Sequence, residues 1–231
     1  MSDTWEKLFR QVALKGNLLK ASVAATLETA YSTATIGASE MLDRGSQFPK
    51  TAVDDALLAA GDKVIRQIAA DPNSRYRKEF HSETAALTSG DVMPTEVGGV
   101  PIVGVFGTVR ETNTNTDMQQ VTKQQLDAYL GITLKQGLYY YAIESVRLWH
   151  TQPTGVVKAD ACLWSKTTQL ALLAASPRGA CPFNSDLHEA VVNIALSILF
   201  RGMNNQEQAE QWKVRGDQSL AEAFPRAARG E

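Results

Sequence analysis

The chain has 231 residues, a formal net charge of −2 at pH 7 and 44% hydrophobic residues, a composition typical of a folded protein with a packed core. The near-neutral charge gives no general attraction for nucleic acid, and no apolar run approaches the roughly 18 residues of a membrane helix. The N-terminus mixes charges without an apolar region, and Cys162 and Cys181 are the two cysteines, so we expect no secretory signal, no membrane partner and no disulfide framework.

Residues 4–36 predict a helix that is rich in small side chains. Their apolar positions recur at steps of three, four and seven, which places them on one stripe. Gly16 and Asn17 weaken the middle, and the alanines and threonines make the stripe shallow. We therefore expect a poor core and a packing surface for a neighbouring chain.

A second helix is expected from Thr51. Thr51 and Asp54 have capping-box spacing, a clean apolar stripe runs to Ile68, and Asp71-Pro72 ends the pattern. Residues 74–87 predict a further short helix.

The middle of the chain, residues 92–166, predicts a β-rich insert. Valines and glycines over residues 98–110 favour a strand with bends or bulges. Thr122 and Gln125 have capping-box spacing at the start of a short helix. Residues 138–164 predict a β-hairpin, because Gln152-Pro153-Thr154-Gly155 fits a type I turn.

The last third predicts two consecutive helices. Asn184, Ser185 or Asp186 can cap the first, whose apolar face continues until Gly202 interrupts it. A more polar helix follows and stops at Pro225, before a basic tail.

These elements predict an α+β fold that is mainly α: a helical bundle with a β-rich insert (strand plus β-hairpin) between N- and C-terminal helices. The expected boundaries are a helical extension at 1–45, a bundle from 46–91 and 167–224, the insert at 92–166 and a tail at 225–231. The apolar stripes are numerous, and we expect identical neighbours to cover part of them.

The sequence contains parts of zinc-binding and nucleotide-binding motifs, but none of these motifs is complete. His188-Glu189 begins like a zinc protease helix, but Val192 occupies the place of the second histidine. His150, Cys162, Cys181 and His188 have irregular spacings that do not form a zinc knuckle. Val105-Phe106 stand where a P-loop needs Lys and Ser/Thr. We expect no catalytic, cofactor-binding or metal residues, and no enzyme, although an unrecognised active site in the insert stays open.

A basic and aromatic run offers an alternative. Arg75, Arg77 and Lys78 flank Tyr76, and basic residues interleaved with an aromatic ring can bind single-stranded nucleic acid. A solvated helix face is the simpler interpretation. The alternative function is a single-stranded DNA-binding or replication accessory protein of a phage, whose stacking surface would combine these basic residues with the run Tyr139-Tyr140-Tyr141.

The layout resembles the head-to-tail adaptor (connector) proteins of tailed, especially short-tailed, bacteriophages. Three stretches carry the resemblance: the helix from Thr51, the strands YYYAIESVRLWH and VVKADACLW, and the helix pair PFNSDLHEAVVNIALSILFRG and NNQEQAEQW. The resemblance covers residues 49–224 and is one of layout.

The resemblance implies a ring, commonly of twelve copies, in the virion neck, assembled in the host cytoplasm. Its partners would be the portal protein, a tail or nozzle protein and, transiently, the packaged double-stranded DNA. Helices at 51–70, 187–200 and 205–223 would form the bundle, while the hairpin or the strand at 98–110 would reach the next ring. The candidate docking residues are Arg226 and Arg229 in the tail, with Tyr139, Tyr141, Trp149 and Trp212 as aromatic contacts.

Overall fold

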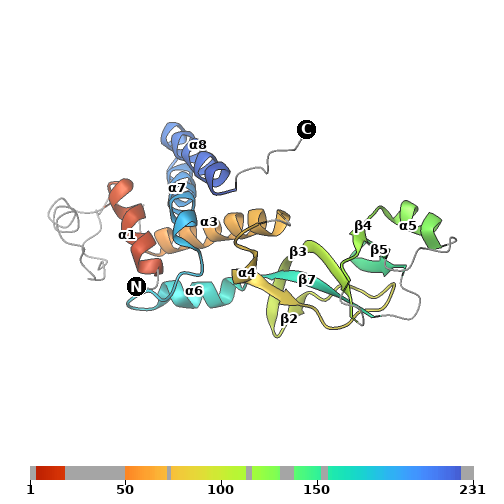
Figure 1. Ribbon diagram of the computed structural model, residues 1–231. Coiled ribbons are helices and arrows are strands. Elements are labelled where there is room, and N and C mark those ends of the chain that lie inside the picture. The colour runs from red at the N-terminus through yellow and green to blue at the C-terminus, as the bar shows by residue number, and fades with distance from the viewer. Residues whose placement is uncertain are drawn as a thin grey trace. The chain divides into compact units, whose positions relative to one another are not determined.

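The computed structural model describes residues 4–18, 50–71, 74–112, 116–130, 138–151 and 156–224, and it confirms the predicted mixture of helices and strands (Figure 1). The helices are α1 (Trp5–Lys15), α3 (Lys50–Ala70), α4 (Arg77–Phe80), α5 (Lys123–Leu130), α6 (Lys166–Ala174), α7 (Ser185–Gly202) and α8 (Gln206–Ala223). The strands are β1 (His81–Glu83), β2 (Glu96–Val97), β3 (Val100–Glu111), β4 (Gln119–Gln120), β5 (Tyr140–Glu144), β6 (Arg147–His150) and β7 (Val157–Leu163). Among the described residues, no helix combines the length and the apolarity needed to cross a membrane.

The chain divides into two compact units. Unit 1 comprises residues 1–64 and 166–231, and unit 2 comprises residues 65–165, so the division falls inside α3. Unit 1 holds the long C-terminal helices, and unit 2 holds the strands.

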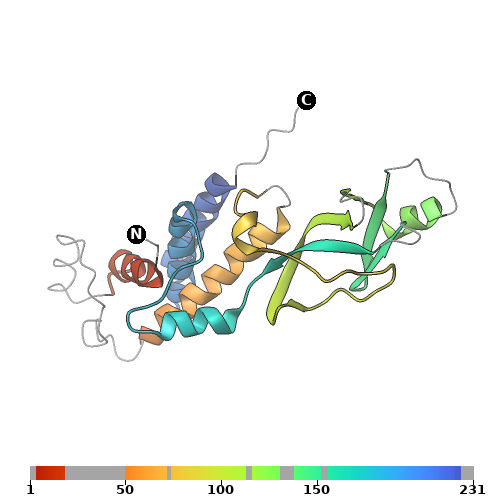
Figure 2. The ribbon, with the colours of Figure 1, turned by 60° about the horizontal axis from the view of Figure 1, so that its bottom comes forward.

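In unit 1, α7 and α8 run side by side as a helical hairpin (Figures 1 and 2). Gly216 of α8 allows this close approach, because a Cβ atom there would lie 2.9 Å from Cγ1 of Ile194. The capping and stop signals of α7 are confirmed: the Asn184 side chain accepts from the backbone N–H of Asp186, and α7 ends at Gly202.

The N-terminal helix is shorter and more deeply buried than predicted. It ends at Lys15, because Asn17 adopts a left-handed conformation (φ 54°) and the N–H of Leu18 donates to the carbonyl of Ala13. The weak point at Gly16 and Asn17 is therefore the end of the helix, and residues 19–36 lie outside the described part of the chain.

The apolar stripes of the described helices form the core of this chain. The prediction of a shallow surface that neighbouring copies cover is wrong for α1, whose Trp5 ring packs at 86° to the ring of Phe183 with 5.9 Å between centroids. Stripe residues with 0% exposure include Trp5, Leu8 and Val12 of α1, Val53, Leu57, Ala60, Val64 and Ile68 of α3, and Leu187, Val191 and Ala195 of α7. One copy buries most of the apolar surface that the periodicity reveals.

The start of α3 differs from the prediction, whereas its end agrees. Lys50 and Thr51 are already helical, so Thr51 is not the N-cap and Asp54 does not complete a capping box. The Asp54 carboxylate instead accepts a hydrogen bond from Nε of Arg178 at 2.7 Å. The helix ends before Asp71, as expected.

Unit 2 contains two sheets. The larger has the strand order β1-β7-β3-β2, and the smaller has the order β4-β5-β6 with β4 parallel to β5. The predicted kinked strand is confirmed as β3, which shifts register twice against β7. Gly98 and Gly99 form the turn before it with positive φ angles of 59° and 78°.

Two predictions in unit 2 are wrong. Residues 138–164 do not form one hairpin, because a turn at Ser145-Val146 pairs β5 with β6, while β7 pairs with β1 and β3. The expected turn at 152–155 lies outside the described residues. Within 74–87 only Arg77–Phe80 is helical, since residues 81–83 pair with β7 as a strand.

The short helix α5 begins as predicted. The N–H of Gln125 donates to Oγ1 of Thr122 at 3.2 Å, and the N–H of Thr122 donates to Oε1 of Gln125 at 3.0 Å. These reciprocal bonds are a capping box.

Candidate functional site

The structure places the predicted docking residues in different parts of the protein. Tyr139, Tyr141 and Trp149 lie on or beside the smaller sheet of unit 2, and Trp212 lies on α8 in unit 1. Arg226 and Arg229 lie outside the described residues.

Tyr141 is part of the core of unit 2. Its side chain is 0% exposed and packs with Val109, Leu148 and Val157, while Tyr139 covers the edge of the same cluster. Burial raises the pKa of Tyr141 to about 12. The Tyr141 side chain therefore stabilises the sheet and is closed to a docking partner in this structure.

Trp149 and the neighbouring aromatic rings hold α5 on the smaller sheet. Nζ of Lys123 lies 4.8 Å from the Trp149 ring centroid, and Tyr129 stacks on Tyr140 with 4.5 Å between centroids. Trp149 is half-buried, and Gly90 lies against its ring. These aromatics position α5 and leave little ring surface for a partner.

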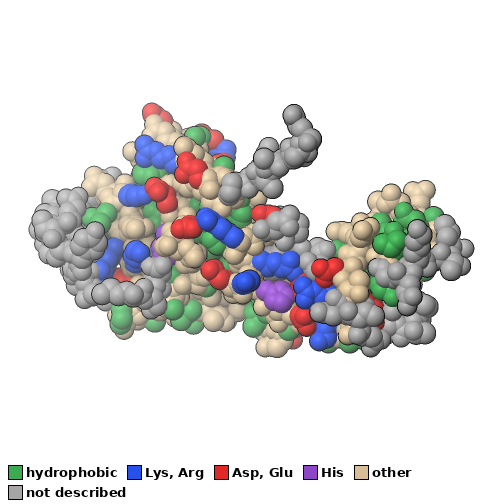
Figure 3. Space-filling model, viewed as in Figure 1, with side chains coloured by type: hydrophobic (Ala, Val, Ile, Leu, Met, Phe, Trp, Pro, Cys, Tyr) green, Lys and Arg blue, Asp and Glu red, His purple; other side chains and the backbone are tan. Residues whose placement is uncertain are grey.

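Aliphatic side chains, rather than the tyrosines, reach the surface of unit 2. Ile143 and Val146 of the β5–β6 hairpin, together with Val92, which bridges to Arg147 beside the turn, are here called the hairpin tip. The exposed fractions of Val92, Ile143 and Val146 are 52%, 36% and 70%. Leu130 and Leu138, near the end of α5, are 58% and 40% exposed. Figure 3 shows hydrophobic side chains at the surface in the region of α5.

The hairpin tip combines exposure with backbone strain. Ser145 and Val146 adopt left-handed conformations with φ angles of 49° and 60°. A left-handed residue that is not glycine costs about 1–2 kcal/mol, and a β-branched side chain fits this region poorly. Glycine or asparagine usually occupies such turns, so the chain carries a strained valine whose side chain points to solvent.

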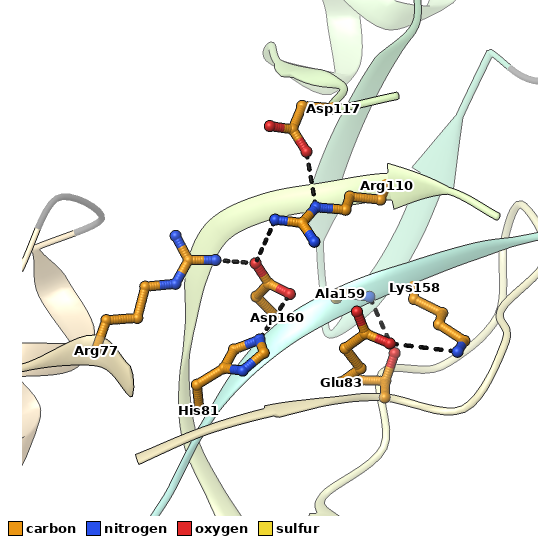
Figure 4. Close-up of polar contacts among 9 residues, drawn as sticks. Arg77, His81, Glu83, Arg110, Asp117, Lys158, Ala159 and Asp160 are labelled. Carbon is orange, nitrogen blue, oxygen red and sulfur yellow. Dashed lines mark hydrogen bonds and ion pairs between the residues drawn. The ribbon is translucent and has the colours of Figure 1, made fainter. Parts of the chain in front are cut away.

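A buried carboxylate organises the polar contacts of unit 2 (Figure 4). Asp160 on β7 is 2% exposed; it pairs with the Arg77 guanidinium and accepts from Nε2 of His81 at 2.9 Å. Nη2 of Arg110 lies 4.0 Å from the same carboxylate, and Nε of Arg110 binds Asp117 at 2.8 Å. Figure 3 shows basic and acidic side chains at the surface around a histidine.

The electrostatics of this network fit a role in stabilising the fold. Burial, followed by the neighbouring Arg77, lowers the pKa of His81. A neutral imidazole N–H therefore donates to Asp160 at neutral pH. Within the described residues, no hydroxyl or thiol bonds to His81, so the His–Asp pair has no nucleophile to activate. The network joins α4, β1 and β3 to β7.

The residues of the nucleic-acid alternative are also engaged. Tyr76 is 2% exposed, and Nη2 of Arg75 donates to its hydroxyl at 2.6 Å. Arg77 pairs with Asp160. A ring buried in this way cannot stack on nucleic-acid bases without local unfolding.

Two of the residues considered for metal binding, His188 and Cys162, are buried inside the protein. Nε2 of His188 donates to the carbonyl of Phe183 at 3.0 Å. Burial raises the pKa of the Cys162 thiol to about 12. Among the described residues, no three His, Cys, Asp or Glu side chains are grouped to hold a metal ion.

Trp212 belongs to a groove in unit 1. Its ring is half-buried, and the Arg215 guanidinium lies over it at 4.7 Å. The groove, of about 530 Å³, is formed by α7, α8 and the end of α1. Its floor includes Asn193, which is 3% exposed and whose Oδ1 has no hydrogen-bond partner.

Sequence reasoning missed the residues that only long-range contacts reveal. Asp160 and Asn193 looked like ordinary strand and helix positions, and the turn at Ser145-Val146 lacks the usual glycine or asparagine. A polar residue within the apolar pattern of α7 was the available signal for Asn193. The chain matches no protein-family model and no curated protein.

Proposed function

We propose that the chain is a structural virion protein: a head-to-tail adaptor that forms a ring below the portal of a short-tailed phage. The ring would join portal to tail around a central channel for genome passage. In this proposal, the described helices of unit 1 form a helical bundle, and the strands of unit 2 form a β-rich insert that reaches the next ring or the tail. The resemblance in layout supports the proposal.

The observation that carries the proposal is the hairpin tip. Val146 combines a left-handed backbone with a side chain that is 70% exposed. Strain at an exposed position gives the isolated chain no stability, and such strain is found where a segment contacts a ligand or a partner. Burial of Val92, Ile143 and Val146 against a partner would offset it, since full burial of one such side chain contributes about 1.5–3 kcal/mol.

Contacts between copies need a second surface. Because the helical stripes are buried within the chain, we assign these contacts to the exposed apolar side chains of unit 1. They are Leu170 on α6, Ile198 on α7 and Val214 on α8, with exposed fractions of 44%, 37% and 60%. They are few, which agrees with a ring that closes only on a portal template.

The first experiment measures mass. The purified chain is compared alone and mixed with the portal protein encoded by the same genome, by native mass spectrometry and negative-stain microscopy. We expect a single ring of copies on each portal. A chain that stays monomeric and leaves the portal unbound at all concentrations would exclude the adaptor function.

The second experiment tests the hairpin tip. Val146→Asp should leave the ring on the portal intact and prevent recruitment of the next tail component. Gln124→Asp introduces the same charge at an exposed position of α5 outside the hairpin tip, and it should change neither step. Equal recruitment by both variants would show that the hairpin tip is not the docking element.

The nucleic-acid alternative has less support, because Tyr76 and Tyr141 of its aromatic residues are buried. A salt-dependent shift of a labelled single-stranded oligonucleotide by the purified chain would favour it over the adaptor.

A further inference from the structure

Two guanidinium groups share one buried carboxylate in unit 2. Arg77 of α4 pairs with Asp160 of β7, and Nη2 of Arg110 on β3 lies 4.0 Å from the same carboxylate (Figure 4). A single carboxylate balances the charge of one arginine and not of two. Burial, followed by the neighbouring Arg110, lowers the pKa of Arg77, since the two positive charges repel each other. A second anion is therefore needed beside Arg110.

The second anion is an exposed carboxylate of the chain itself. Asp117 accepts a hydrogen bond from Nε of Arg110 at 2.8 Å, and its side chain is 66% exposed. An ion pair with this exposure is weak, because water competes for both partners. The contact shows that an oxyanion fits against Arg110 on the solvent side of the cluster, and an anion with more charge and more oxygens can replace Asp117 there.

The donors that an incoming anion needs are accessible. The side chains of Arg77 and Arg110 are 22% and 36% exposed. Among the described residues, Nη1 of Arg110 makes no polar contact, and Figure 4 draws this third nitrogen without a dashed line. Asp160 holds both guanidinium groups in place from the buried side. Binding would therefore immobilise little that is not already ordered.

We propose that Arg77 and Arg110 form a binding site for a single compact phosphate group, either inorganic phosphate or a phosphate monoester. Such a group carries nearly two negative charges at neutral pH, and its oxygens match the planar fork of a guanidinium. Nε and Nη1 of Arg110 would donate to it in place of Asp117, and Arg77 would stabilise its charge. This site goes beyond the proposed adaptor function and does not involve the hairpin tip.

The surroundings favour one phosphate group over a nucleic-acid backbone. Glu79 of α4 is exposed, and Glu83 of β1 pairs with Lys158 of β7 at 3.3 Å, so acidic and basic side chains alternate around the cluster (Figure 3). A polyanion would meet these carboxylates as well as the arginines. Tyr76 is buried, so this ring offers no surface on which bases could stack.

The test uses the full chain and the imidazole signals of its histidines in an NMR spectrum. The chain has three histidines. Nε2 of His81 donates to Asp160 and its side chain is 33% exposed, whereas His150 and His188 are 3% and 4% exposed and act as internal references. His81→Gln assigns the reporting signal. The probe is inorganic phosphate at constant pH, and sodium chloride at the same ionic strength is the control.

We expect phosphate, and not chloride, to shift the His81 signal in a saturable manner. Arg110→Gln should weaken binding about tenfold, because a charge-assisted contact is lost. Asp117→Asn removes the competing carboxylate and should tighten binding about threefold. Lys78→Gln removes the same charge as Arg110→Gln at an exposed position of α4 outside the cluster, and it should leave binding unchanged.

Several results would overturn the proposal: no saturable shift of His81 at millimolar phosphate, equal shifts by phosphate and chloride, equal binding by Arg110→Gln and Lys78→Gln, or weaker binding by Asp117→Asn. The last variant loses only an exposed carboxylate, so it keeps the test valid even where Arg110→Gln fails to fold. A short DNA duplex that binds more tightly than inorganic phosphate, at the same phosphate concentration, would contradict a single-phosphate site. The assay contains no portal protein, so its failure is distinct from a failure of the adaptor function.

Discussion

Replacing Arg178 by methionine tests the buried charges of unit 1. The Arg178 side chain is 0% exposed and binds Asp54 through Nε and Nη2 at 2.7 and 3.2 Å. Its Nη1 binds Oε2 of Glu6 at 3.0 Å, and its guanidinium lies 3.5 Å from the Phe9 ring centroid. The substitution leaves the carboxylates of Glu6 and Asp54, which are 6% and 12% exposed, without this cation.

We expect the Arg178→Met variant to lose about 3–5 kcal/mol in its free energy of unfolding, the range for one partner removed from a buried ion pair. Solvent screening reduces this figure little, because all three side chains are nearly enclosed. Since folded proteins are stable by about 5–15 kcal/mol, this loss is a large fraction of the total stability.

Urea unfolding followed by far-ultraviolet circular dichroism measures the loss. Lys166→Met is the control, because Lys166 forms a surface pair with Asp62 at 3.2 Å and its side chain is 58% exposed. Its removal should change stability by less than about 1 kcal/mol. The triple variant Glu6→Gln/Asp54→Asn/Arg178→Met should be more stable than Arg178→Met, because the two carboxylates that lose Arg178 are then neutral.

Two outcomes would refute this reasoning. A loss in Arg178→Met no larger than in the lysine control would mean that the buried pairs contribute little. A triple variant no more stable than Arg178→Met would mean that the uncompensated carboxylates do not set the size of the effect.

Three further predictions concern unit 2. Val146→Gly should raise the free energy of unfolding by up to about 1 kcal/mol, because glycine adopts φ 60° without strain; a lower urea midpoint would contradict it. Burial and Arg77 lower the pKa of His81, so the unfolded chain takes up a proton first as the pH falls below about 6.5, and stability should fall there. This part of the pH dependence should vanish in His81→Gln, and identical pH profiles would argue against it. Gly104→Ala should destabilise the protein by about 1–3 kcal/mol, because the new Cβ would lie 2.9 Å from Cβ of Ala69. The control, Gly202→Ala in unit 1, meets no atom within 4 Å and should leave stability unchanged. Thermal unfolding compares the two, and equal melting temperatures would disprove the close approach.

The sequence predicted elements whose signals are local. The stripe of α3 and the stop before Asp71 agree with the structure, as does the capping box of Thr122 and Gln125. Each depends on residues within a few positions of one another, so a single chain segment contains the information.

Pairing between distant strands could not be predicted in the same way. Residues 138–164 contain two strand patterns, and the sequence offers 152–155 as a suitable turn. The sequence does not indicate the tighter turn at Ser145-Val146, because serine and valine rarely adopt positive φ angles. Val157–Leu163 pairs instead with strands more than 45 residues away along the chain.

The candidate sites depend still more on tertiary contacts. Aromatic residues are frequent at interfaces, which is why the sequence predicts docking contacts at Tyr139, Tyr141, Trp149 and Trp212. One sequence cannot distinguish an interfacial ring from a core ring. Tyr141 is a core residue, whereas the plain valine at position 146 is exposed.

The sequence by itself determined the apolar faces of α3 and α7 and the points at which these two helices end, because periodicity and stop signals act over one or two turns. The tertiary structure alone decided that those faces meet one another within a single chain, that Arg178 is buried with Glu6 and Asp54, and that Asn193 keeps an acceptor unpaired. Burial and charge pairing join residues that are far apart in the chain, and their free energies depend on distances that a linear pattern does not contain.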